Sequence, residues 1–94
     1  MTLTVSASLF PMGKLVITRG ASAELEQDNV LRCLVRHSAG DWGELEEFDW
    51  KQNDDAVEYG GRILSSYRTR CGTRFWIITE CDRSVTTILL PEEY

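Results

Sequence analysis

The sequence predicts a small α+β fold, with short helices packed against an antiparallel sheet. Apolar residues recur at helical spacing in the first half of the chain, and three short β-branched or apolar segments follow closely in the second half. With 94 residues and a hydrophobic fraction of 43%, the chain has room for one core. We therefore predict a single domain over residues 1–94, comprising a lead-in (1–13), a helical part with an acidic block (14–61), antiparallel strands (62–90) and an acidic tail (91–94).

The first predicted elements are a short strand and a short helix. Residues 14–18 (KLVIT) are rich in β-branched side chains, which favour a strand. The hydroxyl of Thr18 or Ser22 can accept a hydrogen bond from the free backbone N–H groups at the start of a helix that runs to about Gln27.

A second helix is predicted from Asn29 to Ser38. Asp28 is a suitable N-cap, and Gly40 is placed where a helix commonly ends. The apolar residues expected to face the core are Val30, Leu31, Leu34 and Val35.

A third helix is predicted from Phe48 to Tyr59, although its apolar pattern is weak. The pair Gly60 and Gly61 ends it. Between the second and third helices, Asp41-Trp42-Gly43 is expected to form a turn around a large aromatic side chain.

The C-terminal third predicts a three-stranded antiparallel meander over residues 62–68, 73–80 and 84–90. The middle segment (TRFWIITE) is almost wholly apolar at its centre, as expected for a central strand covered on both faces. Pro91 ends the last strand. If the protein forms a dimer rather than a monomer, the exposed strand edge expected to mediate it is residues 84–90.

An acidic block between the second helix and the strands is the strongest charge feature. From Asp41 to Glu58 it contains eight acidic residues and one lysine, a net charge of −7, while the whole chain carries −5. Such a face can repel nucleic acid, imitate it or dock a basic protein surface. The acidic balance argues against general nucleic-acid binding, which depends on Lys and Arg neutralising phosphates.

Trp42 and Trp50 lie beside or inside this block. Aromatic side chains supply contact area at protein interfaces, and acidic side chains steer a basic partner. Both rings can equally fold inward and leave the acids as a solvated helix face. The residues predicted to bind a partner are Asp41, Trp42, Glu44, Glu46, Glu47, Asp49, Asp54 and Asp55.

The alternative function is a small metal-independent endoribonuclease of the toxin type. Its candidate residues are His37, Arg62, Glu80 and Arg83. A glutamate base, an arginine on a phosphate and a histidine acid are the groups that such chemistry needs. In the structural alternative, Asp82 and Ser84 bind backbone amides in a turn and Arg83 is solvated or paired with Glu80.

Neither a metal nor a cofactor is predicted. Cys33 and His37 have a possible ligand spacing, but the chain has no CxxC pair. The three cysteines are an odd number, which favours free thiols and a cytoplasmic location. No segment has the roughly 20 apolar residues of a membrane helix, and no basic segment resembling a signal peptide precedes the N-terminal apolar residues.

Two strings in the sequence resemble a known family. Residues 36–43 match the pattern RHxxGDWG, and residues 61–94 match GRILSxYxxxxGxxxWIITExDRSxTTxLLPEEY. The chain is similar over residues 18–94 to small bacterial proteins of plasmids, integrative elements and phages, labelled "plasmid-related protein" or "type I restriction endonuclease subunit M". The second label conflicts with the sequence, which is short and has no glycine-rich cofactor loop.

The resemblance implies a mobile-element setting close to restriction and other defence genes. In that setting we expect a non-enzymatic protein-binding module, acting as an anti-CRISPR or anti-restriction inhibitor. Its expected partner is a protein with a basic surface rather than nucleic acid or a membrane.

Overall fold

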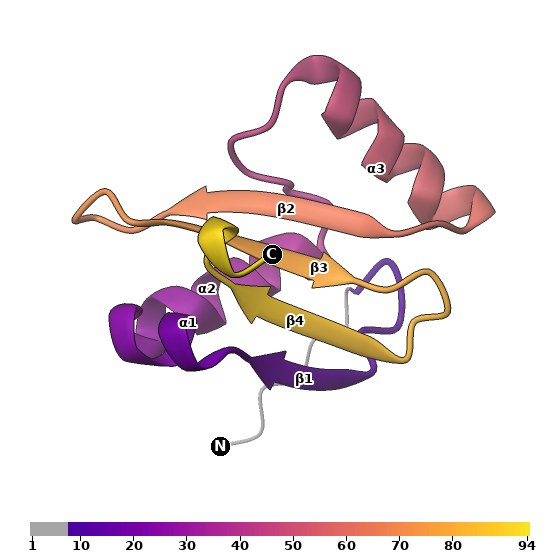
Figure 1. Ribbon diagram of the computed structural model, residues 1–94. Coiled ribbons are helices and arrows are strands. Elements are labelled where there is room, and N and C mark those ends of the chain that lie inside the picture. The colour runs from indigo at the N-terminus through magenta and orange to yellow at the C-terminus, as the bar shows by residue number, and fades with distance from the viewer. Residues whose placement is uncertain (1–7) are drawn as a thin grey trace.

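The computed structural model describes residues 8–94 and confirms the predicted α+β class (Figure 1). Its elements follow the predicted order, with small shifts at their ends. They are β1 (Lys14–Ile17), α1 (Arg19–Glu24), α2 (Gln27–Ser38), α3 (Glu47–Tyr59), β2 (Ile63–Arg68), β3 (Arg74–Thr79), β4 (Val85–Leu89) and a final 3-10 turn, η1 (Pro91–Glu93).

The sheet has four strands in the order β1-β4-β3-β2. Strands β2, β3 and β4 form the predicted antiparallel meander, and the short N-terminal strand β1 adds to it in parallel with β4. Lys14 is in register with Val85 and Ile17 with Ile88. The expectation that residues 84–90 form an exposed edge is therefore wrong, because β1 covers that side of β4 and is itself the edge strand.

Helices α1 and α2 lie on one face of the sheet, while α3 lies beside the β2 edge (Figure 1). The main core forms between α1, α2 and the sheet. Its apolar residues are Ala21, Leu25, Val30, Cys33, Leu34, Tyr67, Phe75, Ile77, Ile88 and Leu90. A smaller cluster under α3 comprises Phe10, Trp42, Ala56 and Ile63.

Helix α2 buries a different stripe from the predicted one. Val30 and Leu34 are buried, but Leu31 is 37% and Val35 42% exposed. Cys33 and His37 complete the buried side at positions i+3 and i+7 from Val30, which is the spacing of one helix face. The missed polar member of this stripe, His37, therefore lies in the core.

The helix ends agree in part with the predictions. The Thr18 hydroxyl accepts a hydrogen bond from the Ala21 N–H at 3.2 Å, so Thr18 caps α1. Helix α2 begins at Gln27 rather than at Asn29, and Glu26 rather than Asp28 is its N-cap. Gly40, with a φ of 86°, follows α2 as expected.

The predicted lead-in contributes to the core. Its residues 1–7 lie outside the described residues, but Phe10 is only 5% exposed and its ring contacts those of His37 and Trp42. Among residues 8–94, no helix combines the length and apolar character needed to cross a membrane.

Candidate functional site

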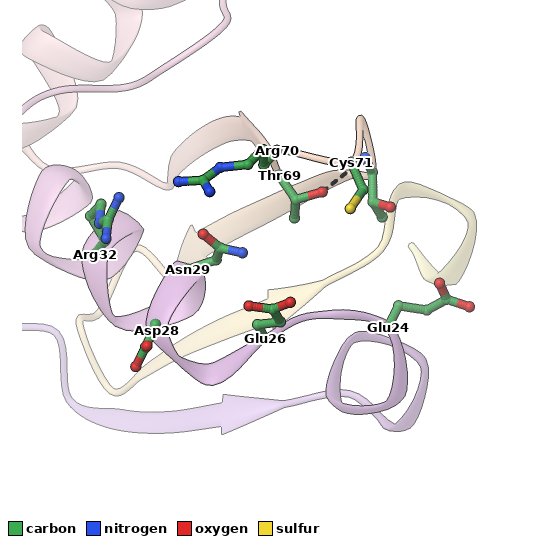
Figure 2. Close-up of a pocket in the computed structure, with 9 residues that line it drawn as sticks. Glu24, Glu26, Asp28, Asn29, Arg32, Thr69, Arg70 and Cys71 are labelled. Carbon is green, nitrogen blue, oxygen red and sulfur yellow. Dashed lines mark hydrogen bonds between the residues drawn. The ribbon is translucent and has the colours of Figure 1, made fainter.

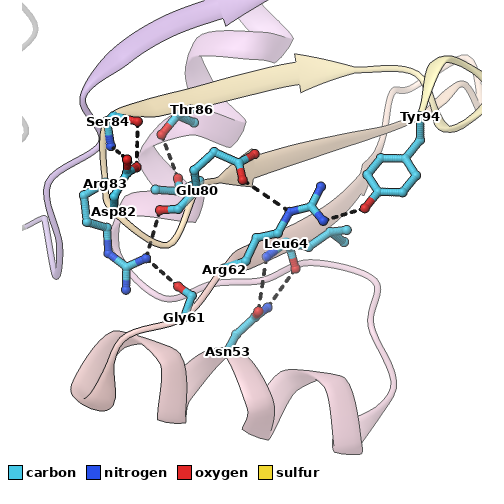
Figure 3. Close-up of polar contacts among 11 residues, drawn as sticks. Asn53, Gly61, Arg62, Leu64, Glu80, Asp82, Arg83, Ser84, Thr86 and Tyr94 are labelled. Atoms are coloured by element: carbon cyan, nitrogen blue, oxygen red, sulfur yellow. Dashed lines mark hydrogen bonds and ion pairs between the residues drawn. The ribbon is translucent and has the colours of Figure 1, made fainter.

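Helix α3 carries most of the acidic block, and one side chain attaches it to the sheet. The Asn53 Nδ2 group donates to the carbonyl of Leu64 at 2.8 Å, and the Leu64 N–H donates to Asn53 Oδ1 at 3.2 Å (Figure 3). The carboxamide thus pairs with β2 as the backbone of a neighbouring strand would. This contact fixes which side of α3 faces the sheet.

Arg83 holds the other end of α3. Its guanidinium donates to the carbonyl of Ala56 at 2.8 Å. It also donates to the carbonyl of Gly61 at 2.5 Å (Figure 3). A cation at a helix C-terminus satisfies free carbonyls and interacts favourably with the helix dipole. Arg83 is therefore a positioning residue for the acidic helix, and both of its terminal nitrogens donate to backbone carbonyls.

The outward side of α3 combines negative charge with exposed aromatic rings. Asn53 and Ala56 are buried on the opposite side, whereas Phe48 is 71% and Tyr59 77% exposed. The helical repeat of 3.6 residues places these two rings on the same side as three exposed carboxylates and Lys51. We call the following residues the acidic surface: Glu47, Phe48, Asp55, Glu58 and Tyr59.

Trp42 was predicted to contact a partner, and the structure shows that this is wrong. Its side chain is 0% exposed, and its Nε1–H donates to Asp54 Oδ1 at 2.9 Å. The ring packs edge-on against His37, with 5.7 Å between ring centroids. Trp42 therefore fastens the loop before α3, and Asp54 serves as its acceptor.

Two further predicted carboxylates have intramolecular partners. Asp41 forms an ion pair with Arg36 at 2.7 Å, and this hydrogen bond lowers the pKa of the Asp41 carboxyl. Glu44 lies 3.4 Å from Arg68 and 3.6 Å from Arg74.

Four predicted binding residues remain exposed and available on the surface: Glu46, Glu47, Asp49 and Asp55. Sequence reasoning missed Phe48, Glu58 and Tyr59 as members of the same surface. A helical projection of residues 47–59 would have found them, once Asn53 and Ala56 were taken as the buried side.

His37 lies at the centre of a buried chain of hydrogen bonds. Its ring is 0% exposed, with Nδ1 at 2.5 Å from the Ser65 hydroxyl and Nε2 at 2.9 Å from the Thr79 hydroxyl. The Thr79 hydroxyl lies 2.7 Å from that of Thr86, which donates to the carbonyl of Met12. Since the Thr86 proton is used in this way, Thr79 donates to Thr86, His37 Nε2–H donates to Thr79, and Ser65 donates to Nδ1.

This environment keeps His37 neutral. Burial lowers its pKa from 6.5 to about 3, because the charged imidazolium would lose its hydration. Both ring nitrogens are occupied and neither reaches solvent.

Three of the four residues of the ribonuclease alternative lie at one corner of the sheet, where the Arg83 guanidinium also donates to the carbonyl of Glu80 at 3.2 Å, but His37 does not join them. Arg62 and Glu80 form an exposed pair at 3.8 Å, and Arg62 also donates to the Tyr94 hydroxyl (Figure 3). His37 is enclosed in the core, and the Arg83 guanidinium is bound to backbone carbonyls.

Most polar residues of the two resemblance strings have structural partners. Asp82 Oδ1 accepts from the backbone N–H and the hydroxyl of Ser84, at 3.0 Å and 2.6 Å (Figure 3). Glu93 accepts from the hydroxyl of Thr18 and the N–H of Gly20, so the C-terminal turn is fastened to the start of α1. At these positions, the residues of the two strings therefore stabilise the fold.

A separate hollow lies between the α1–α2 junction and the β2–β3 turn (Figure 2). It is lined by charges of both signs, with Glu24, Glu26 and Asp28 on one side and Arg32 and Arg70 near the other. In the part of the chain that the structure describes, no group of three or more His, Cys, Asp or Glu side chains could hold a metal ion. The three cysteines are free, and burial raises the pKa of the Cys33 thiol.

Comparisons with known proteins give no family assignment. A scan against protein-family models found no match, and searches of the curated proteins and of the solved structures found none either. The function must therefore be argued from the geometry described above.

Proposed function

We propose that this protein is a non-enzymatic binding module that docks through the acidic surface of α3 on a basic surface of a partner protein. The observation that carries the proposal is the exposure of Phe48 and Tyr59, at 71% and 77%, among carboxylates that form no ion pair or side-chain hydrogen bond with the described residues 8–94. Large exposed aromatic rings lose contact with water only when a partner covers them.

The two rings and the charges have complementary roles. Phe48 and Tyr59 are eleven positions apart, so they lie about 16 Å apart along the helix axis. This distance suits two apolar pockets on one partner. The carboxylates of Glu47, Asp55 and Glu58 accelerate the encounter with a basic surface and disfavour nucleic acid.

The attachment of α3 to the sheet supports the proposal. Asn53 and Arg83 attach α3 to β2 and to the β3–β4 turn through backbone groups. Preorganisation of this kind reduces the entropy lost on binding.

The resemblance to mobile-element proteins supports a host defence complex as the partner. We propose a cytoplasmic anti-defence inhibitor that occupies the basic groove of a CRISPR or restriction complex. The groove that receives nucleic acid in such complexes has the charge that the acidic surface would bind.

The test is affinity capture with three forms of the protein, followed by mass spectrometry. One form is the native chain, and the second carries Glu47→Lys, Asp55→Lys and Glu58→Lys. The third is a matched control with the same change in net charge, carrying Glu24→Lys, Glu26→Lys and Asp28→Lys. We expect a partner that the native and control forms retain and the α3 variant loses.

A second round separates the rings from the charges. Phe48→Ala together with Tyr59→Ala should weaken binding of the captured partner at all salt concentrations, because these rings act by burial. The difference in affinity between the native protein and the charge variant should shrink as the salt concentration rises, because screening weakens charge interactions. Retention of the same partner by all three forms in the first round would exclude the acidic surface as the docking site.

A further inference from the structure

Strand β1 is an exposed edge with an apolar side. Among residues 8–94 it pairs only with β4, and Leu15, Val16 and Ile17 are 50%, 38% and 43% exposed. Charged residues discourage pairing at a strand edge, and the one charged residue of this strand is Lys14 at its start. It also contains neither proline nor a bulge within its four residues.

The backbone of β1 has hydrogen-bonding groups free for another strand. The N–H of Lys14 donates to Ser84 and that of Thr18 to Ile88, both towards β4. Successive residues of a strand turn these groups to opposite sides. Leu15 and Ile17 therefore direct theirs away from β4, where no strand of residues 8–94 pairs with them.

An apolar groove continues from this edge to α2. It is lined by side chains of β1, α1, α2 and β4, including Leu15, Ile17, Leu25, Val30 and Leu31. Leu31 and Val35 extend the exposed apolar surface along α2. A strand added to β1 would bring side chains over this groove.

We propose that a second copy of this chain occupies the edge, pairing β1 with β1 antiparallel about a two-fold axis. We assign the register that pairs the outward backbone groups of residues 15 and 17 of one copy with those of residues 17 and 15 of the other, because both outward residues of each strand are then used. Leu15 of each copy lies opposite Ile17 of the other, and Val16 lies opposite Val16. The product is a continuous eight-stranded sheet.

Charge complementarity favours this occupant over an unrelated peptide. In the same register, Lys14 lies opposite Thr18 of the second copy. The Thr18 hydroxyl holds the exposed Glu93 carboxylate at 2.5 Å, and this hydrogen bond keeps the carboxyl ionised. Each Lys14 ammonium therefore meets Glu93 of the other copy, which gives two symmetric ion pairs at the ends of the paired strands.

The distribution of negative charge also permits self-association. The acidic surface lies beside β2, at the opposite edge from β1 (Figure 1). In the two-fold dimer the two α3 helices are at the outer edges, separated by roughly 34 Å of sheet at the usual strand spacing of about 4.8 Å. Repulsion over such a distance is screened at physiological salt.

The first test is the mass of the intact protein in solution by sedimentation equilibrium. We expect twice the chain mass for the native protein and monomer mass for Ile17→Lys. Phe48→Lys, which changes a more exposed apolar residue on α3, is the matched control and should remain dimeric. Lys14→Glu should weaken the dimer about tenfold, because two attractive pairs become repulsive, and Lys14→Arg should preserve it.

A cross-linking experiment tests the register. Residues opposite each other in a non-hydrogen-bonded antiparallel pair have Cα atoms about 4.5 Å apart, within disulfide range. In a chain with Cys71→Ser and Cys81→Ser, Val16→Cys should therefore form a disulfide with itself on mild oxidation, and Leu15→Cys should not.

Monomer mass at every concentration, or equal cross-linking of the two cysteine variants, would overturn the proposal. Neither result bears on the acidic surface, since a monomer can still dock its partner through α3.

Discussion

The two edges of the sheet differ in how their outward backbone groups are satisfied. At β2, the side chain of Asn53 pairs with Leu64, and the loop before α3 pairs with Ser66 through the carbonyl of Trp42 and the N–H of Glu44. At β1, the outward groups of Leu15 and Ile17 have no strand beside them among the described residues. One edge is closed by the chain itself and the other is left open.

This difference shows that an edge can be closed without a fifth strand. The Asn53 carboxamide and loop residues 42–44 cover β2, with Gly43 bridged to Ser66, and in doing so they place α3 and its carboxylates. The closed edge therefore presents the acidic surface, while the open edge is available for a second sheet. Substitutions near each edge should therefore differ in how much they change the stability of the protein.

The largest effect is expected from Gly43→Ala, which disturbs the loop on β2. Gly43 has a φ of 77°, and a Cβ there would lie 2.0 Å from the carbonyl oxygen of Ser66. We expect a loss of about 3 kcal/mol in the free energy of unfolding, from left-handed backbone strain and overpacking together. Urea denaturation measures it.

Gly72→Ala is the control for that variant. Gly72 has a similar φ of 89°, but a Cβ there would meet nothing within 4 Å. Its cost should be about 1 kcal/mol, the backbone contribution alone. Equal losses for both variants would show that the close approach of the loop to β2 does not matter.

The next effect concerns the side chain that closes the edge. Asn53→Ala leaves the N–H and carbonyl of Leu64 without partners, and we expect a loss of about 2–3 kcal/mol. Hydrogen exchange should also show faster exchange of the Leu64 amide. Gln52→Ala, at an exposed neighbouring position of α3, should change stability by less than about 0.5 kcal/mol.

His37 joins β2 to β3 through its hydrogen bonds to Ser65 and Thr79. Its titration makes the stability of the fold depend on pH. Its pKa is 6.5 when hydrated and about 3 in the folded protein. As the pH falls below 6.5, the unfolded chain takes up a proton that the folded chain cannot, so stability falls. The slope approaches about 1.4 kcal/mol per pH unit between those two pKa values.

The measurement is urea denaturation over this pH range for the native protein and for His37→Gln. The carboxyls of Asp41 and Glu93, whose pKa values are also lowered, contribute to both proteins with the same sign. The difference between the two pH profiles isolates the imidazole. Parallel profiles would contradict a neutral buried His37.

The smallest effect is expected at the open edge. Leu15→Thr replaces a half-exposed side chain whose backbone groups do not pair with β4, so the monomer should lose no more than about 0.5 kcal/mol. Chemical denaturation at protein concentrations that favour the monomer measures this. A loss like that of Asn53→Ala would mean that the β1 edge is already covered within one chain.

Local patterns were sufficient to predict much of the fold. The alternating and apolar segments after Gly61 correctly predicted the antiparallel meander, and Gly40 correctly predicted the end of α2. The parallel pairing of β1 with β4 joins residues about 70 positions apart, and no local pattern contains that information. The buried stripe of α2 was misassigned because His37, a polar residue, is part of it.

The candidate site was predicted less well, because charge alone does not show which side of a helix is exposed. Asp41 and Asp54 are acidic, yet one binds Arg36 and the other binds Trp42. Trp42 turns inward because the loop around it is tied to β2, a contact that depends on the fold. Phe48 and Tyr59 could be found only after Asn53 was known to face the sheet.

The pairing of β1 with β4 has a consequence for the order of folding. β2, β3 and β4 can form from neighbouring hairpins, but β1 has no partner until residues 85–88 have been synthesised. The bond between Thr18 and Glu93 closes later still. Contacts of such long sequence separation slow folding, because a large loop must close first. During synthesis, β1 and the apolar face of α2 therefore remain without β4 until that strand has been made, and exposed apolar surface of this kind favours aggregation.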